Sequence, residues 1–179
     1  MVNSYRKKIQ EEQEILSRVG GGKATATAVI ETEPQNGDTV FVYYHFSANG
    51  ENYGGAALVL PTGKTPAGLP VEDGDEFTVF YIENQAYNHS LKLSMPVVAQ
   101  IERYRKRVTA RHAALNPNLT EQQVACQLDI ALQLKGLEGW ADFYFQDATP
   151  AENPLNNNLT YKRLIRDVPF KRAEQKACW

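Results

Sequence analysis

Apolar and polar residues alternate along much of the first half of the chain, and turn-forming residues interrupt the alternation at short intervals. A period of two is typical of strands that bury one face. Asn49-Gly50 lies between two such runs and is a strong hairpin signal. The pattern predicts five short antiparallel strands that curl into a small barrel or a rolled sheet. Their expected bounds are 24–33, 39–48, 51–60, 76–82 and 91–93, with loops at 61–70 and 84–88 and an acidic segment at 72–76.

The second half of the chain changes to a helical period. Pro96 is suited to open a helix, and Asn116-Pro117 ends it near Leu115. A stripe at helical spacing is expected to be its buried face, formed by Val97, Val98, Ile101, Tyr104 and Val108.

A second helix has a well-marked start. Thr120 is expected to be the N-cap, Gln123 completes a capping box, and Leu119 is placed to contact Val124. The helix is expected to end at Gly136. Residues 137–146 fit a helix or a strand, and we favour a helix with its aromatic side chains buried. Whether this segment is core or binding surface stays open. A further helix is expected after Pro154, where Leu159-Thr160 repeats the Leu-Thr entry of the second helix.

The N-terminal residues 4–19 also have a helical pattern, which the glycine triplet at 20–22 ends. This helix is expected to pack either on its own chain or on another protein. The fold class predicted from the sequence is therefore α+β: an N-terminal helix, a small five-stranded antiparallel barrel or rolled sheet, and a helical C-terminal half. The corresponding division is 1–22, 23–94 and 95–179.

The strand region contains a characteristic set of turn and core residues: Tyr44, Phe46, Asn49, Gly50, Tyr53, Gly54, Gly74, Asp75, Val79, Tyr81, Asn84, Ser90 and Leu91. This set resembles a widespread bacterial β module of unknown function. The resemblance covers about residues 24–93, and the family usually has a proline where this chain has Gln85. In that family the module often lies beside membrane helices. The resemblance implies a bacterial source and supports the fold, but implies no activity.

Charge is distributed unevenly in this chain of 179 residues with a net charge of −2. Residues 1–91 hold 6 Lys and Arg against 12 Asp and Glu, whereas residues 92–179 hold 13 against 9. Two explanations are open. Either the two halves dock on each other, which we favour, or the basic half meets an anionic partner.

The cysteines and hydropathy favour a cytoplasmic protein with no transmembrane segment. Cys126 and Cys178 are too few for a disulfide framework, so a reducing compartment is the simpler interpretation. Cys126 is expected to be a small buried thiol. The three histidines show no metal-ligand spacing, and we expect neither a metal nor a cofactor.

The strongest polar feature is the basic face of the helix that follows Pro96. Arg103, Arg107 and Arg111 are spaced by four residues, so their guanidinium groups share one helix face that is suited to bind phosphates or carboxylates. The same face could instead satisfy the acidic segment. No catalytic motif is recognisable in the sequence.

The leading functional prediction is a non-enzymatic bacterial binding or accessory protein that engages a protein partner. The first alternative is binding of an anionic ligand or nucleic acid through the three arginines. The second is an enzyme whose site is assembled only in three dimensions, around His112, Cys126 or the aromatic segment 137–146. The sequence does not determine the oligomeric state.

Overall fold

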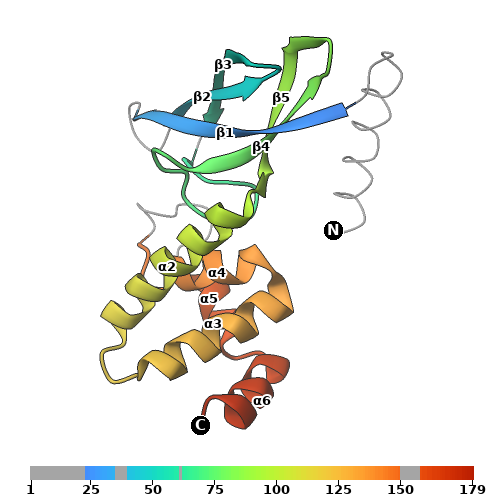
Figure 1. Ribbon diagram of the computed structural model, residues 1–179. Helices are drawn as coiled ribbons and strands as arrows, with labels where there is room; N and C mark the ends of the chain where they lie inside the picture. The colour runs from blue at the N-terminus through green and yellow to red at the C-terminus, as the bar shows by residue number, and fades with distance from the viewer. Residues whose placement is uncertain (1–22, 35–39, 61, 150–157) are drawn as a thin grey trace.

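The computed structural model describes residues 23–34, 40–60, 62–149 and 158–179. Figure 1 shows a curled sheet at one end of the molecule and a group of helices at the other. The helix predicted for residues 4–19 and the glycine triplet lie outside the described residues. In the described part, five strands precede all of the helices, so the predicted α+β class is confirmed.

The five predicted strands form one antiparallel sheet in the order β3-β2-β1-β4-β5. The long strand β1 pairs with β4 through its first half and with β2 through its second half. The sheet curls into a half-barrel, as predicted, and the phenol oxygen of Tyr44 on β2 lies 2.8 Å from Nδ1 of His89 on β5 across the curl. The strands are β1 Lys23–Pro34, β2 Val40–Ala48, β3 Glu51–Leu60, β4 Glu76–Ile82 and β5 Gln85–Pro96.

The turns of the sheet were predicted with unequal success. Asn49 and Gly50 both have positive φ, 53° and 81°, which is the conformation expected of the hairpin between β2 and β3. The predicted last strand at 91–93 lies within β5, but β5 already begins at Gln85, so the predicted loop at 84–88 is wrong. Gln85, Tyr87 and Asn88 are exposed, and pairing with β4 holds the segment in the sheet although Ala86 and Asn88 have a low strand propensity.

Helix α2 (Val98–Leu115) ends where predicted, but it begins two residues after Pro96, which is the last residue of β5, and its buried face is only partly the predicted one. Val98 is 80% exposed, and the buried residues are Gln100, Tyr104, Val108 and His112. The sequence suggested only apolar residues for this face. The side-chain oxygen of Gln100 accepts a hydrogen bond from the backbone N–H of Glu76, at 3.1 Å, which offsets part of the cost of burying this polar group. The side-chain nitrogen of Gln100 has no hydrogen-bond partner among the described residues.

Helix α3 (Glu121–Lys135) begins as predicted. Thr120 accepts a hydrogen bond from the backbone N–H of Gln123 at 3.2 Å, and the Gln123 side chain accepts from Thr120 N–H at 2.9 Å. After Gly136 the chain enters α4 (Leu137–Tyr144), so the predicted helix at 137–146 is confirmed. Trp140 is buried as expected, and its indole N–H donates to the carbonyl of Leu128 at 2.9 Å.

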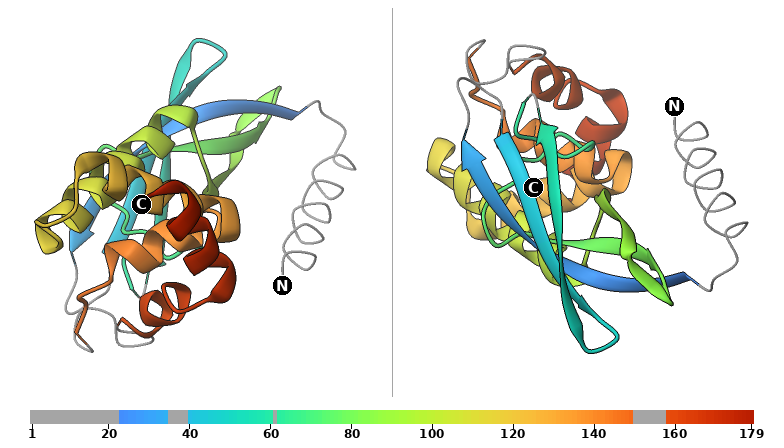
Figure 2. Two further views of the ribbon diagram at one scale, coloured as in Figure 1. Left: turned by 90° about the horizontal axis from the view of Figure 1, so that it is seen from below. Right: turned by 90° about the horizontal axis from the view of Figure 1, so that it is seen from above.

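The last two helices differ from prediction. Helix α5 (Leu159–Leu164) begins one residue before Thr160, so Thr160 does not cap it. Helix α6 (Val168–Ala177) was not predicted. Phe170 is the only buried residue of α6. Figure 2 shows α6, in red, packed at the side of α3 and α4.

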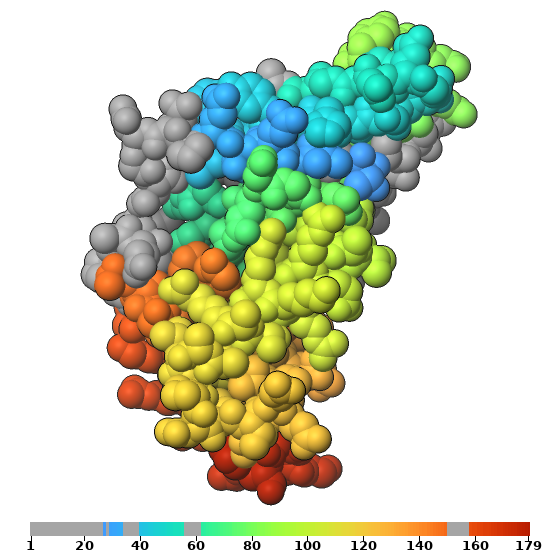
Figure 3. Space-filling view, turned by 60° about the vertical axis from the view of Figure 1, so that its left-hand side comes forward, coloured from blue at the N-terminus to red at the C-terminus, as the bar shows by residue number. Residues whose placement is uncertain are grey.

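One continuous core joins the sheet to the helices. Its buried residues include Ile30, Val42 and Phe77 from the strands and Tyr104 and Leu128 from the helices. Figure 3 shows the green surface of the strand region directly against the yellow-green surface of α2. None of the described helices has the length and hydropathy that a membrane crossing requires.

Candidate functional site

Arg107, the central member of the predicted basic face, is bound to the acidic segment of residues 72–76. Its guanidinium makes two hydrogen bonds to the carboxylate of Asp75, at 2.6 and 3.1 Å, and its Nε lies 3.1 Å from the carboxylate of Glu72. The Asp75 side chain is fully buried, at 0% exposure. Burial lowers the pKa of Arg107, but the hydrogen bonds and charges of these two carboxylates outweigh burial, so the pKa is raised. Arg107 is therefore charged and held in the fold.

Arg103 also binds the acidic segment, and we call the contacts of Arg103 and Arg107 with this segment the junction. Arg103 donates to the carbonyl oxygen of Gly74 and to the carboxylate of Glu76, the latter at 3.3 Å. The acidic segment is in turn tied to the sheet, because the N–H of Gly74 donates to Ile30 O and the N–H of Ile30 donates to Asp75 O, both at 2.9 Å. Arg103 and Arg107 thus connect α2 to the strand region through its acidic segment.

Arg111 is not part of this junction. Its guanidinium binds Asp147, with an Nη2 to Oδ1 distance of 2.8 Å, and lies over the ring of Tyr144. The structure therefore brings Arg103 and Arg107 together and separates Arg111 from them. Of the two arrangements considered for the basic face, Arg103 and Arg107 adopt the one in which the arginines bind the acidic segment, whereas Arg111 does not. Binding of an external anion by these arginines stays a prediction, and such an anion would have to compete with the internal ion pairs.

The two cysteines form a disulfide between α3 and the end of α6. Cys126 lies on α3, Cys178 is the C-cap of α6, and their Cα atoms are 5.7 Å apart. The prediction that Cys126 is a small buried thiol is wrong, so Cys126 has no free thiol to contribute to an enzyme site. The argument for a reducing compartment also loses its basis. Sequence reasoning missed the bond because the cysteines are 52 residues apart.

The three histidines lie in three different environments. His112 is buried, and its Nε2 lies 2.7 Å from the side-chain oxygen of Gln127, whose amide donates to Glu174 on α6 at 2.6 Å. His89 lies inside the curl of the sheet, where burial lowers its pKa. His45 is exposed beside Glu31. Among the described residues, no group of three or more His, Cys, Asp or Glu is placed to hold a metal ion.

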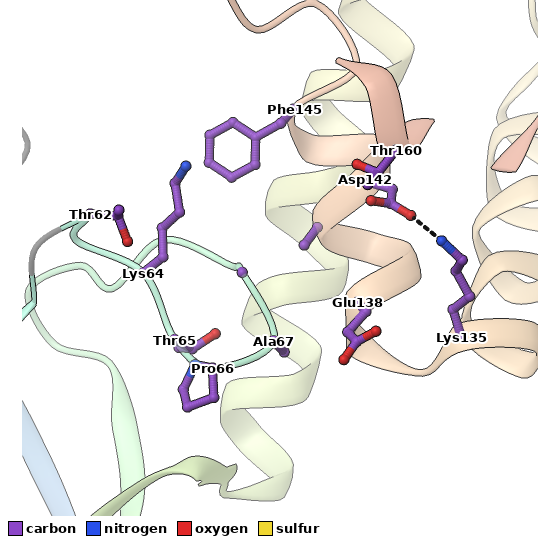
Figure 4. Close-up of a pocket in the computed structure, with 12 residues that line it drawn as sticks. Thr62, Lys64, Thr65, Pro66, Ala67, Lys135, Glu138, Asp142, Phe145 and Thr160 are labelled. Carbon is purple, nitrogen blue, oxygen red and sulfur yellow. Dashed lines mark hydrogen bonds and ion pairs between the residues drawn. The ribbon is translucent and has the colours of Figure 1, made fainter. Parts of the chain in front are cut away.

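A hollow of about 320 Å³ lies between the loop at 62–70 and helix α4 (Figure 4). The loop is folded back by a bridge between Lys64 and Pro70 and by the hydroxyl of Thr65, which accepts from Leu69 N–H at 3.2 Å. Gly68 has a φ of +88°, and a Cβ there would lie 3.3 Å from the Cβ of Ala141 on α4. Glycine at this position lets the loop touch the helix, and the hollow is bounded by that contact.

Charges of both signs and an aromatic ring border the hollow. The ammonium of Lys64 lies 4.0 Å from the centre of the Phe145 ring. Asp142, whose side chain is only 9% exposed, is bound by Lys135 at 2.9 Å. Figure 4 shows Glu138 on the side of α4, across the hollow from Lys64.

Sequence reasoning did not find this site. The segment 61–70 had only the composition of a loop, and the segment 137–146 was undecided between core and surface. The structure divides the latter: Trp140 and Phe143 are core, whereas Phe145 faces the hollow. The feature of the sequence that could have indicated this site is a lysine inside a loop rich in threonine, proline and glycine.

Comparison with known proteins adds no relative: no family model, no curated protein and no solved structure matches the chain.

Proposed function

We propose that this chain is a non-catalytic binding protein, and that its ligand site is the hollow between the loop at 62–70 and α4. The observation that carries the proposal is the convergence of Lys64, Phe145, Glu138 and the Lys135 to Asp142 pair on one concave space. Small-molecule sites are concave and combine apolar lining with a few placed polar groups. The lining of this hollow has both, because Ala67, Pro66 and Ala141 lie among the charged residues.

The basic face of α2 is the weaker candidate. Binding to nucleic acid draws on lysines and arginines that are available to neutralise phosphates. Arg103, Arg107 and Arg111 each have a carboxylate partner within the chain. Releasing Arg107 would leave the buried Asp75 without its counter-charge, which is costly. This argues for a structural role of the face.

We include three expectations from the sequence in this proposal: a bacterial source, the resemblance to a β module, and a protein partner. In this proposal the protein is an accessory component whose ligand-bound form engages its partner. For its location we favour an oxidising compartment over the cytoplasm, because disulfides persist mainly where thiols are not kept reduced.

The test is an amide-resolved NMR screen of the full chain against a library of small polar metabolites. We expect hits to shift the amides of residues 62–68 and 138–145. A variant that fills the hollow, Ala67→Trp, should lose those hits, whereas Ala110→Trp on the exposed side of α2 should keep them. Hits that persist unchanged in Ala67→Trp, or a library without hits, would contradict the proposal.

A further inference from the structure

A groove lies between α3 and α6 and reaches the disulfide that joins these two helices. Its volume is about 650 Å³, and Cys126 is part of its lining. Both helices line the groove with small residues, Ala125 on α3 and Ala173 and Ala177 on α6. Neither cysteine of the disulfide is fully buried. A thiol from solvent can therefore approach this disulfide, and access is one of the factors that set the rate of thiol–disulfide exchange.

Helix α6 is held on the other helices by few side chains apart from the disulfide. Phe170 is its only buried residue, and the Phe170 ring lies 6.0 Å from the ring of Phe143 on α4. Glu174 accepts a hydrogen bond from the side chain of Gln127 on α3, at 2.6 Å. The helix has 10 residues, and isolated helices of this length are marginal in water. Once the disulfide is broken, α6 is expected to open locally while the rest of the protein stays folded.

We propose that the disulfide is a site of thiol–disulfide exchange, and that its reduction by a dithiol lets α6 open. A thiolate of the dithiol enters the groove and attacks Sγ of Cys126. The bond to Cys178 breaks, and the Cys178 thiolate takes up a proton. The second thiolate of the dithiol then attacks the reductant's own sulfur in the mixed disulfide, and Cys126 leaves and is protonated. The protein gains two electrons and two protons, and the dithiol becomes a disulfide.

The opening concerns the end of the molecule that lies away from the sheet, where Figure 1 shows α6. It separates Glu174 from Gln127, whose side-chain oxygen lies 2.7 Å from Nε2 of the buried His112. The chain that moves runs from the end of α5 at Leu164 to Cys178. In the chain-entropy model, a crosslink that closes a loop of roughly 15 residues suppresses its opening about a hundredfold. Reduction should increase the opening of α6 by that factor. This inference goes beyond the proposed function and does not depend on the hollow beside α4.

The first test asks whether the groove is the route to the disulfide. The folded, oxidised full chain is mixed with dithiothreitol, samples are quenched with an alkylating reagent, and free thiols are counted by mass spectrometry. Ala125→Phe places a ring in the groove beside Cys126 and should slow the reduction severalfold, because it restricts access to the sulfur. Its matched control, Ala110→Phe on the exposed side of α2, should leave the rate unchanged. Thermal unfolding checks that both variants are folded. Equal rates in all three proteins, or no reduction of the folded protein, would overturn the proposal.

The second test measures the opening of α6 by amide hydrogen exchange of the full chain, oxidised and reduced. We expect the protection of the hydrogen-bonded amides of α6 to fall about a hundredfold on reduction and to lie below that of α2. The double variant Cys126→Ser, Cys178→Ser should match the reduced protein and should not respond to dithiothreitol. Reoxidation of the wild type with oxidised glutathione should restore the protection. If α6 in the reduced protein stays as protected as α2, the helix does not open on its own and the proposal is wrong.

Discussion

Breaking the disulfide should destabilise the protein by an amount that its position in the chain allows us to calculate. The bond joins Cys126 to Cys178 across a sequence separation of 52 residues. In the chain-entropy model, a crosslink that closes a loop of this length lowers the conformational entropy of the unfolded state. This loss raises the free energy of the unfolded state by about 4 kcal/mol at 25 °C. Folded-state contacts of α6, namely the burial of Phe170 and the hydrogen bond from Gln127 to Glu174, do not require the bond.

The measurement is urea unfolding of the oxidised protein, of the same protein in excess reductant, and of the Cys126→Ser, Cys178→Ser double variant. We expect the reduced protein and the double variant to agree with each other and to lose up to about 4 kcal/mol of unfolding free energy relative to the oxidised form. The wild type should also show no reactive thiol after oxidation with glutathione. Identical unfolding midpoints with and without reductant, or two thiols that stay reactive after oxidation, would refute the reasoning.

Three further predictions follow from the junction and the sheet. Arg107→Gln should lower the free energy of unfolding in urea by about 3 kcal/mol, because it leaves the buried carboxylate of Asp75 without its counter-charge. Arg105→Gln breaks an exposed ion pair with Asp129 and should lower the free energy of unfolding by less than about 1 kcal/mol. Equal losses in the two variants would contradict a structural role of Arg107. Gly55→Ala should cost about 1 to 3 kcal/mol because its Cβ would overlap the tyrosine ring that covers it, and Gly54→Ala, where a Cβ has open space, is the control; a harmless Gly55→Ala would show that the ring is not held there. Burial lowers the pKa of His89, so the unfolded chain takes up its proton first as the pH falls, and stability should decrease below about pH 6.5; unfolding curves from pH 8 to 5 should show a smaller decrease in His89→Gln, and an unchanged profile would exclude His89 as the cause.

The elements that were predicted correctly are those whose signals are local. Asn49-Gly50 specifies its own hairpin, because both residues tolerate positive φ. The capping box of Thr120 and Gln123 fixes the start of α3 through bonds made within four residues. In both cases the groups that determine the local structure lie within a few residues of one another in the sequence.

The elements that were missed depend on groups far apart in the chain. The start of β5 depends on its pairing with β4. The buried face of α2 includes Gln100, whose side-chain oxygen accepts a hydrogen bond from the backbone N–H of Glu76. The disulfide and the hollow likewise require segments that the fold alone brings together. For Arg107 the sequence left two possible binding partners open, an external anion and the acidic segment. In the structure Arg107 is paired with Asp75 of the acidic segment.

The central claim is that the arginines of α2 belong to the fold and that the ligand site is the hollow beside α4. One amide-resolved NMR experiment on the full chain tests both parts, with a mixture of small polar metabolites as the first titrant and a short single-stranded oligonucleotide as the second. The account predicts that the metabolites shift the amides of residues 62–68 and 138–145 and that the oligonucleotide leaves residues 103–111 unchanged. Shifts at 103–111 on addition of the oligonucleotide, with none around the hollow from the metabolites, would contradict it.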